Sequence, residues 1–170
     1  MNQPRWKTRA ERPSDVPAIH DINVAAFETP AEADLVDALR ADVSWIEGLS
    51  MVATDARDRP VGHALLTRCH IGDVPALCLA PCAVLPAHQR AGAGSAAIRA
   101  ALHAAQERGE HFVVVLGHPD YYPRFGFRRA SEAGIRLGIE IPDEALMALN
   151  LDGGRRLPRG EVRYAAPFAI

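Results

Sequence analysis

Small residues gather at one junction of the chain, where an apolar stretch gives way to a helical pattern. The segment VLPAHQRAGAGS (84–95) places Gly92 and Gly94 beside Ala91 and Ala93. A helix that begins here directs unpaired backbone N–H groups, and about half a positive charge, toward the preceding loop. Without bulky side chains in the way, a diphosphate can reach those donors. The pattern predicts an anion site, although close packing of the helix on a sheet would use the same small residues.

Two other phosphate-binding motifs fit this segment poorly. A P-loop requires Gly-Lys-Ser/Thr, but Ser95 follows Gly94 with no lysine between them. The dinucleotide-binding pattern GxGxxA matches Gly92, Gly94 and Ala97. That motif needs a strand that runs directly into its first glycine, but residues 86–91 intervene here. It also needs an acidic residue at the end of the next strand. We therefore expect neither a nucleoside triphosphate nor NAD or FAD.

Three cysteines, Cys69, Cys78 and Cys82, form no CxxC pair, which argues against a disulfide scaffold or a zinc ribbon. If residues 72–73 form a hairpin turn, Cys69 and Cys78 could face each other across two strands. With His70 and Cys82 nearby, a metal site is an alternative. Since His70 would point to the face opposite Cys69, we expect reduced, buried thiols and no metal.

Apolar periodicity divides the first half of the chain into strands and helices. Ser14 precedes a helical pattern, and a second helix start combines the cap Thr29, a first-turn Pro30 and the capping-box Glu32. The expected elements are a strand over 5–11, helices over 16–27 and 30–39, and antiparallel strands over 49–55, 61–71 and 76–85.

The second half opens with the helix after the glycines, which we expect to end near Gly109. FVVVLG (112–117) is continuously apolar, as in a strand buried on both faces. We then expect a short helix over 121–125, strand material over 126–141, a helix over 144–151 and a final segment over 160–168. Antiparallel strands followed by a crossover helix indicate a mixed-sheet α+β fold.

Pro81 interrupts the apolar strand ALCLAPCAVL (76–85). Proline cannot donate to a sheet ladder, so the strand must contain a bulge or lose a partner there. The backbone groups of Cys82, Ala83 and Val84 would then lack a neighbouring strand. An extended ligand that carries amides could pair with them as an added strand does, whereas an ordinary edge bulge would leave them to solvent.

Together these segments resemble a known superfamily. Gln89, Gly92 and Gly94, preceded by VLP, resemble the Q/R-x-x-G-x-G/A acetyl-CoA loop of the GNAT N-acetyltransferases. YPRFGF (122–127) resembles that superfamily's Tyr-x-x-x-Gly-Phe segment. LGHPDYYPRFGFR, with the later MALNL and VRYAAPF, is similar to its YhbS-like branch, and the similarity extends over nearly the whole chain.

This resemblance implies a fold and a cofactor site. The fold would be a single GNAT-like α+β domain over residues 1–170, with a mixed, mostly antiparallel twisted sheet flanked by helices and a bulged fourth strand splayed from the fifth. The co-substrate would be acetyl-CoA, with its pantetheine arm along the fourth strand and its diphosphate on the loop amides. The implied cofactor-binding residues are Cys82, Ala83, Val84, Gln89, Arg90, Ala91, Gly92, Ala93, Gly94 and Ser95.

The resemblance also implies the reaction, direct attack of a primary amine on the acetyl carbonyl in a ternary complex. Tyr122 occupies the superfamily's tyrosine position and would protonate the departing sulfur as general acid, with Tyr121 as the competing phenol. A backbone N–H near Val84, freed by the bulge, would polarise the thioester. A covalent acetyl-Cys82 intermediate is an alternative, but no activating histidine is evident beside it.

The general base is not evident, because residues 80–82 are Ala, Pro and Cys where many relatives carry a glutamate. Glu28, His118, Asp120 or a water chain could take that role. We expect Phe27 and Glu28 to contribute to the acceptor wall, together with Glu32. Without a strong base, a non-catalytic acyl-CoA-binding sensor is the alternative function.

Charge and composition limit the partners. The 170 residues are 48% hydrophobic and 24% charged, with a net charge of −2 and no basic block. We therefore expect one well-packed core, a small-molecule or peptide amine as acceptor, and neither nucleic acid nor membrane as partner. The amino-terminal residues lack a signal-peptide core, which favours the cytoplasm. A homodimer is compatible with these features.

Overall fold

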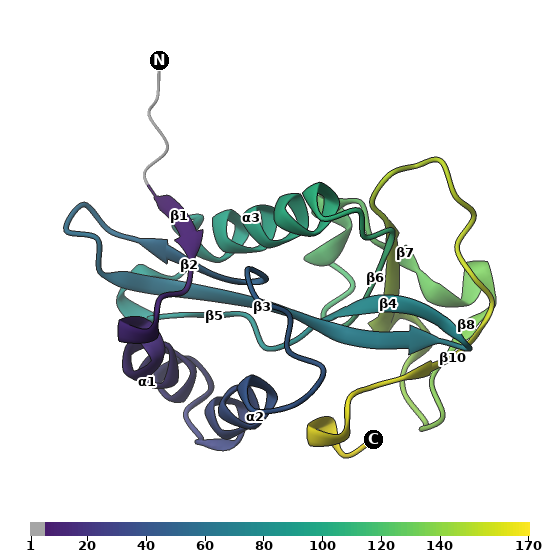
Figure 1. The fold of residues 1–170 in the computed structure, drawn as a ribbon, viewed down its shortest axis with the longest axis horizontal. Coiled ribbons are helices and arrows are strands. Elements are labelled where there is room, and N and C mark those ends of the chain that lie inside the picture. Colours follow the sequence, from purple (N-terminus) through teal and green to yellow (C-terminus); the bar gives the residue numbers. More distant parts are fainter. Residues whose placement is uncertain (1–5) are drawn as a thin grey trace.

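Residues 6–170 are described by this computed structural model, and the first five, including Arg5 of the expected first strand, lie outside the described part. One mixed sheet forms the centre of the molecule (Figure 1). Its strands, in spatial order, are β1 (Lys7–Ala10), β2 (Ser50–Thr54), β3 (Pro60–Ile71), β4 (Val74–Leu79), β6 (Phe112–Leu116), β9 (Leu146–Asn150) and β7 (Arg128–Arg129). Off this path, β5 (Ala83–Val84) and β10 (Gly160–Arg163) pair with β3, and β8 (Ile135–Arg136) pairs with β10.

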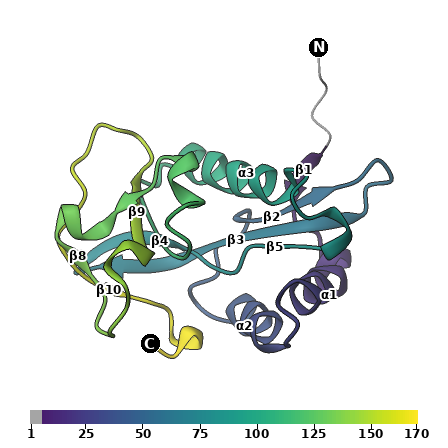
Figure 2. The ribbon, with the colours of Figure 1, turned by 180° about the vertical axis from the view of Figure 1, so that it is seen from behind.

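Strands β4 and β6 pair in parallel, as do β8 and β10, while the other described pairs are antiparallel. Helix α3 (Ala93–Glu107) covers one face of the sheet, and α1 (Val16–Phe27) and α2 (Ala31–Arg40) cover the other (Figures 1 and 2). This arrangement confirms the mixed, mostly antiparallel α+β fold. No helix of residues 6–170 is long and apolar enough to cross a membrane.

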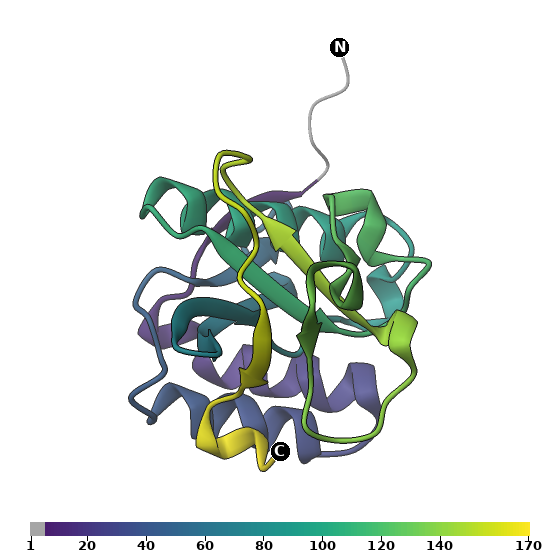
Figure 3. The same cartoon turned by 90° about the vertical axis from the view of Figure 1, so that its right-hand side faces the viewer.

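Each sheet face has its own apolar core. The buried stripe of α3, including Ala97, Ile98 and Ala101, lies over β2 and β3 and belongs to one cluster with Val113 and Val115 of β6. On the opposite face, helices and sheet meet through a smaller cluster whose buried members are Ile19, Val36, Leu39, Val52, Leu65 and Ala80. The C-terminal 3-10 turn Ala166–Phe168 lies beside α2 (Figure 3). The two helices and this turn therefore form one wall beside the sheet.

Most expected elements are confirmed, but the expected helix over 144–151 is wrong. Residues Leu146–Asn150 form strand β9, which pairs antiparallel with both β6 and β7. Leu, Met and Ala favour helices, but propensity is weak against two rows of sheet hydrogen bonds and burial against β6. Helix α2 also begins one residue later than expected, with Pro30 at its N-cap rather than its first turn.

The bulge expected at Pro81 is confirmed by the strand register. Leu79 of β4 pairs with Leu66, and Ala83 of β5 pairs with His63. The three residues Ala80, Pro81 and Cys82 therefore face only two residues of β3, which is the extra residue of a β-bulge. The bulge divides the expected strand 76–85 into β4 and β5.

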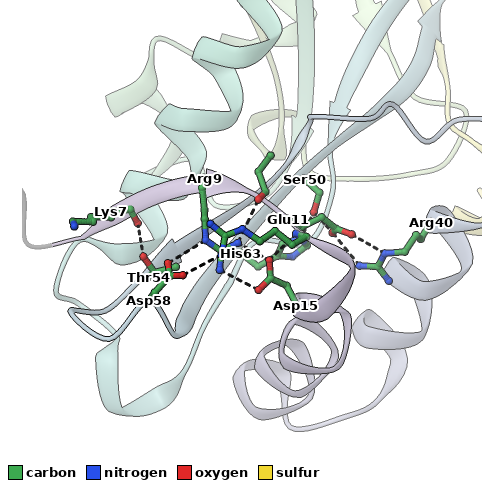
Figure 4. A network of polar contacts seen from close by, with 11 residues as sticks. Lys7, Arg9, Glu11, Asp15, Arg40, Ser50, Thr54, Asp58 and His63 are labelled. Carbon is green, nitrogen blue, oxygen red and sulfur yellow. Dashed lines mark hydrogen bonds and ion pairs between the residues drawn. The ribbon is translucent and has the colours of Figure 1, made fainter.

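A buried polar network attaches α1 and α2 to the sheet (Figure 4). The Arg40 guanidinium of α2 donates to both carboxylate oxygens of Glu11, at 3.0 and 3.1 Å. Glu11 also accepts a 2.5 Å hydrogen bond from Ser50 Oγ, which lies 2.8 Å from Nε2 of the fully buried His63. At the start of α1, Arg9 forms a bidentate pair with Asp15, at 2.6 and 3.1 Å. Neighbouring elements are thus fixed by charge-assisted hydrogen bonds.

Burial, and then the Arg40 charge, lower the pKa of His63 to about 3. The folded protein keeps this ring neutral while the unfolded chain binds a proton below about pH 6.5. We expect the free energy of unfolding to fall with decreasing pH below this value, by up to about 1.4 kcal/mol per unit from His63 alone. Urea denaturation at pH 7, 5.5 and 4.5 measures this slope. His63→Gln retains a donor toward Ser50 and should have the smaller slope; equal slopes would contradict this assignment.

Candidate active site

Beyond Pro81, the sheet opens between β5 and β6. Strand β4 pairs with β6 at Leu77 and Cys78, whereas β5 pairs with β3 and not with β6. The N–H of Leu85 donates to Val61 of β3 at 2.9 Å. Because consecutive residues of a strand point their backbone groups to opposite sides, the N–H of Val84 points away from β3 and toward the opening. The expected splaying of the fourth strand from the fifth is confirmed.

The glycine loop lies at one end of this opening. Gly92 is the N-cap of α3, with φ of 90°, and the first helical bond runs from Ala96 N–H to the Gly92 carbonyl. The N–H groups of Ala93, Gly94 and Ser95 therefore have no partner within the helix. A Cβ on Gly94 would lie 3.1 Å from Val84 Cγ2, so this glycine brings the helix start close to β5.

Several of the predicted cofactor residues are held by side chains around the loop. Gln89 Nε2 donates to the Val84 carbonyl at 3.2 Å and links the loop to β5. Trp6 Nε1 donates to the Ala91 carbonyl at 2.7 Å. The alternating pattern over 5–11 predicts only a strand at Trp6, and no local pattern indicates its contact with a loop 85 residues away.

A cavity of about 550 Å³ lies on the α1 and α2 side of the opening. Tyr122 and Cys82 line it, as does the predicted acceptor residue Phe27. The lining also includes Glu32, Leu35, Cys78, Leu79, Ala80, Pro81, Val115, Leu116, Gly117, His118, Tyr164, Phe168 and Ile170. The structure therefore brings the predicted tyrosine, the bulge and the α1–α2 wall together.

Two residues predicted for the acceptor side or as general base, Glu28 and Asp120, lie outside this lining. Glu28 ends α1 in a left-handed conformation, with φ of 61°, and does not line the cavity, whereas Glu32 of α2 does. Among the candidate bases, His118 lines the cavity and Asp120 does not. Of the residues predicted for an acceptor wall, Phe27 and Glu32 line the cavity, and the direction of the chain at the end of α1 keeps Glu28 out of it.

The two neighbouring tyrosines have different surroundings. Tyr121 OH lies 3.0 Å from Ser95 Oγ, on the α3 side. Tyr122 lies against the end of β6, where a Cβ on Gly117 would come 2.5 Å from its ring atom Cε2. Burial, followed by the nearby Cys82 thiol, raises the pKa of Tyr122 above its usual value. Tyr122 is therefore a neutral phenol that lines the cavity, as a proton donor requires.

The cysteines are protonated thiols in this fold. Burial raises the pKa of Cys82 to about 12, against a smaller lowering by the Tyr122 hydroxyl, and its Sγ lies 3.4 Å from the Ala80 carbonyl oxygen. Cys69 pairs with Ala76 across the hairpin, not with Cys78 as the metal alternative required. A thiol with a raised pKa is a poor nucleophile at neutral pH.

Comparisons with known proteins agree with this geometry. Residues 16–127 match the model of the acetyltransferase (GNAT) family. The chain is 36% identical over 162 residues to the uncharacterized N-acetyltransferase YjhQ of Escherichia coli, covering 91% of this chain and 89% of that protein.

Two solved structures are also similar. That of YhbS from Escherichia coli in complex with CoA has a TM-score of 0.89 and 28% identity, covering 100% of this chain and 96% of the other. A Brucella melitensis GNAT family acetyltransferase in complex with acetyl-CoA has a TM-score of 0.79 and 31% identity, covering 96% and 97% of the two chains. This chain therefore belongs to the GNAT family of N-acetyltransferases.

Proposed function

We propose that this chain transfers the acetyl group of acetyl-CoA to a primary amine in a ternary complex, with residues 1–170 as one catalytic domain. One observation carries the proposal: the unpaired side of β5 extends from the amide-rich loop at Gly92 to the cavity that Tyr122 lines. An extended thioester with amides and a diphosphate matches that path. The two similar structures are complexes with CoA and with acetyl-CoA, which supports the same co-substrate.

In the proposed reaction, the amine nitrogen attacks the acetyl carbon and forms the C–N bond. The Val84 N–H, which points away from β3, donates to the carbonyl oxygen as negative charge develops there. The C–S bond then breaks, and Tyr122 gives its proton to the sulfur. The nitrogen loses a proton to water or His118, and Tyr122 regains one.

The raised pKa of Tyr122 is compatible with this role. Burial raises the pKa of the neighbouring Cys82 thiol to about 12. The same desolvation acts on a CoA thiolate that departs at this place and strengthens it as a base. Desolvation therefore raises the pKa of the Tyr122 phenol and that of the CoA thiol together. The two values stay close enough for the phenol to give its proton to the thiolate.

The two tyrosines can be separated by kinetics. With acetyl-CoA and a panel of primary amines, we expect Tyr122→Phe to lower kcat about 100-fold, because the general acid is removed. Tyr121→Phe loses the contact with Ser95 and should change kcat less than about fivefold. The measurement is CoA release under saturating acetyl-CoA. The reverse ranking would assign the acid to Tyr121, and binding of acetyl-CoA without turnover on any amine would instead favour a sensor.

The loop can be tested by reversing one charge. Arg90 is exposed, with φ of 62°, within the proposed diphosphate loop. We expect Arg90→Glu to raise the Kd for CoA about tenfold at low ionic strength, because it places a carboxylate beside the phosphates. Arg57→Glu, an exposed change of equal charge in the β2–β3 turn, serves as control in the calorimetry. Equal affinities for both variants would contradict this placement.

The covalent alternative predicts that Cys82 is essential, and the direct mechanism predicts the opposite. We expect Cys82→Ala to keep kcat within about threefold of the unchanged protein. Loss of turnover in Cys82→Ala with unchanged acetyl-CoA binding would restore the covalent route.

The raised pKa of Cys82 can be tested separately. Raising a thiol pKa from 9.0 to about 12 lowers its thiolate fraction at pH 8 about 1,000-fold. Thiol titration with a disulfide reagent should therefore be slow in the native protein and rapid for all three cysteines after unfolding.

A further inference from the structure

The chemistry of the cavity lining restricts which amine the proposed reaction can use. Three of the six large apolar side chains that are exposed in residues 6–170 line the cavity: Phe27 is 37% exposed, Leu116 39% and Ile170 52%. Leu35 and Phe168 add apolar surface from the same wall. Exposed apolar side chains that share one concave surface mark a site for an apolar ligand.

The cavity offers no permanent cation to an anion. Among residues 6–170, no lysine or arginine lines it, His118 is its one histidine, and Glu32 is its one acidic side chain. Burial raises the pKa of Cys78, Tyr122 and Tyr164, which keeps these groups neutral at pH 7. A ligand carboxylate or phosphate would therefore lose its hydration without gaining a lysine or arginine.

Glu32 is placed to receive a cation. Its Oε2 accepts a hydrogen bond from Thr29 Oγ1 at 3.1 Å at the start of α2. Within the described residues, nothing donates to Oε1, and the side chain is only partly buried. One carboxylate oxygen thus remains available to a protonated amine that enters the cavity.

From these features we infer that the acceptor is a monoamine on an apolar, ring-sized body that carries no carboxylate or phosphate, with Glu32 attracting its ammonium form. A volume of about 550 Å³ suits a compact molecule of this kind. A polyamine would bring further ammonium groups into a cavity that has no second acidic side chain to pair with them. A free amino acid would bring its own carboxylate close to that of Glu32. The inference rests on the proposed acetyl transfer.

Matched amines test the inference. With saturating acetyl-CoA, we expect kcat/KM for phenethylamine to exceed that for phenylalanine and for spermidine at least tenfold. Phenylalaninamide, which replaces the carboxylate by a neutral group, should recover most of that loss, since charge rather than size is responsible. Turnover of phenylalanine or spermidine at or above the phenethylamine rate overturns this inference and leaves the acetyl transfer intact. If none of these amines is acetylated although calorimetry shows that acetyl-CoA binds, both this inference and the proposed acetyl transfer are overturned.

Glu32→Gln keeps the acceptor for Thr29 and removes only the charge. We expect it to raise KM for phenethylamine about fivefold and to leave KM for acetyl-CoA unchanged. Asp34→Asn removes an equal charge from the same helix turn at an exposed position outside the lining, and should leave both values unchanged. Equal effects of the two variants would show that Glu32 acts only through general charge or helix stability, and would overturn its role.

Discussion

The missing backbone N–H of Pro81 is the constraint on which the proposed active site depends. A continuous strand over 76–85 would pair with both neighbours and close the sheet. Instead, the bulge adds one residue opposite β3, and the strand continues as β5 beside β3 alone. The backbone of Val84 therefore faces an opening in the middle of the sheet. In a continuous sheet, a neighbouring strand would pair with it there.

Two separate groups of elements complete that opening. On one face, the start of α3 comes close to β5 because Gly94 has no side chain. On the other, α2 is fixed by the network that links Arg40, Glu11, Ser50 and His63, and the start of α1 by the pair of Arg9 and Asp15. The two sides of the opening are thus supported by different interactions.

The features that sequence reasoning predicted correctly are those that a few neighbouring residues decide. Helix α3 begins at the glycines as expected, Pro81 breaks the ladder it cannot join, and the strand expected over 112–117 is β6 (Phe112–Leu116), buried except at Leu116. Strand β9 was mistaken for a helix because its type depends on pairing with β6, which lies about 30 residues earlier. Likewise, the choice of Glu32 over Glu28 depends on where α1 ends, and boundaries are the least certain part of a sequence pattern.

The hydrogen bond from Trp6 to the Ala91 carbonyl has a further consequence. It connects the residue that directly precedes β1 to the loop before α3. A molecule that orders this loop when it binds would therefore also favour docking of β1, without touching that strand. By thermodynamic linkage, docking of β1 would favour binding of that molecule by the same factor.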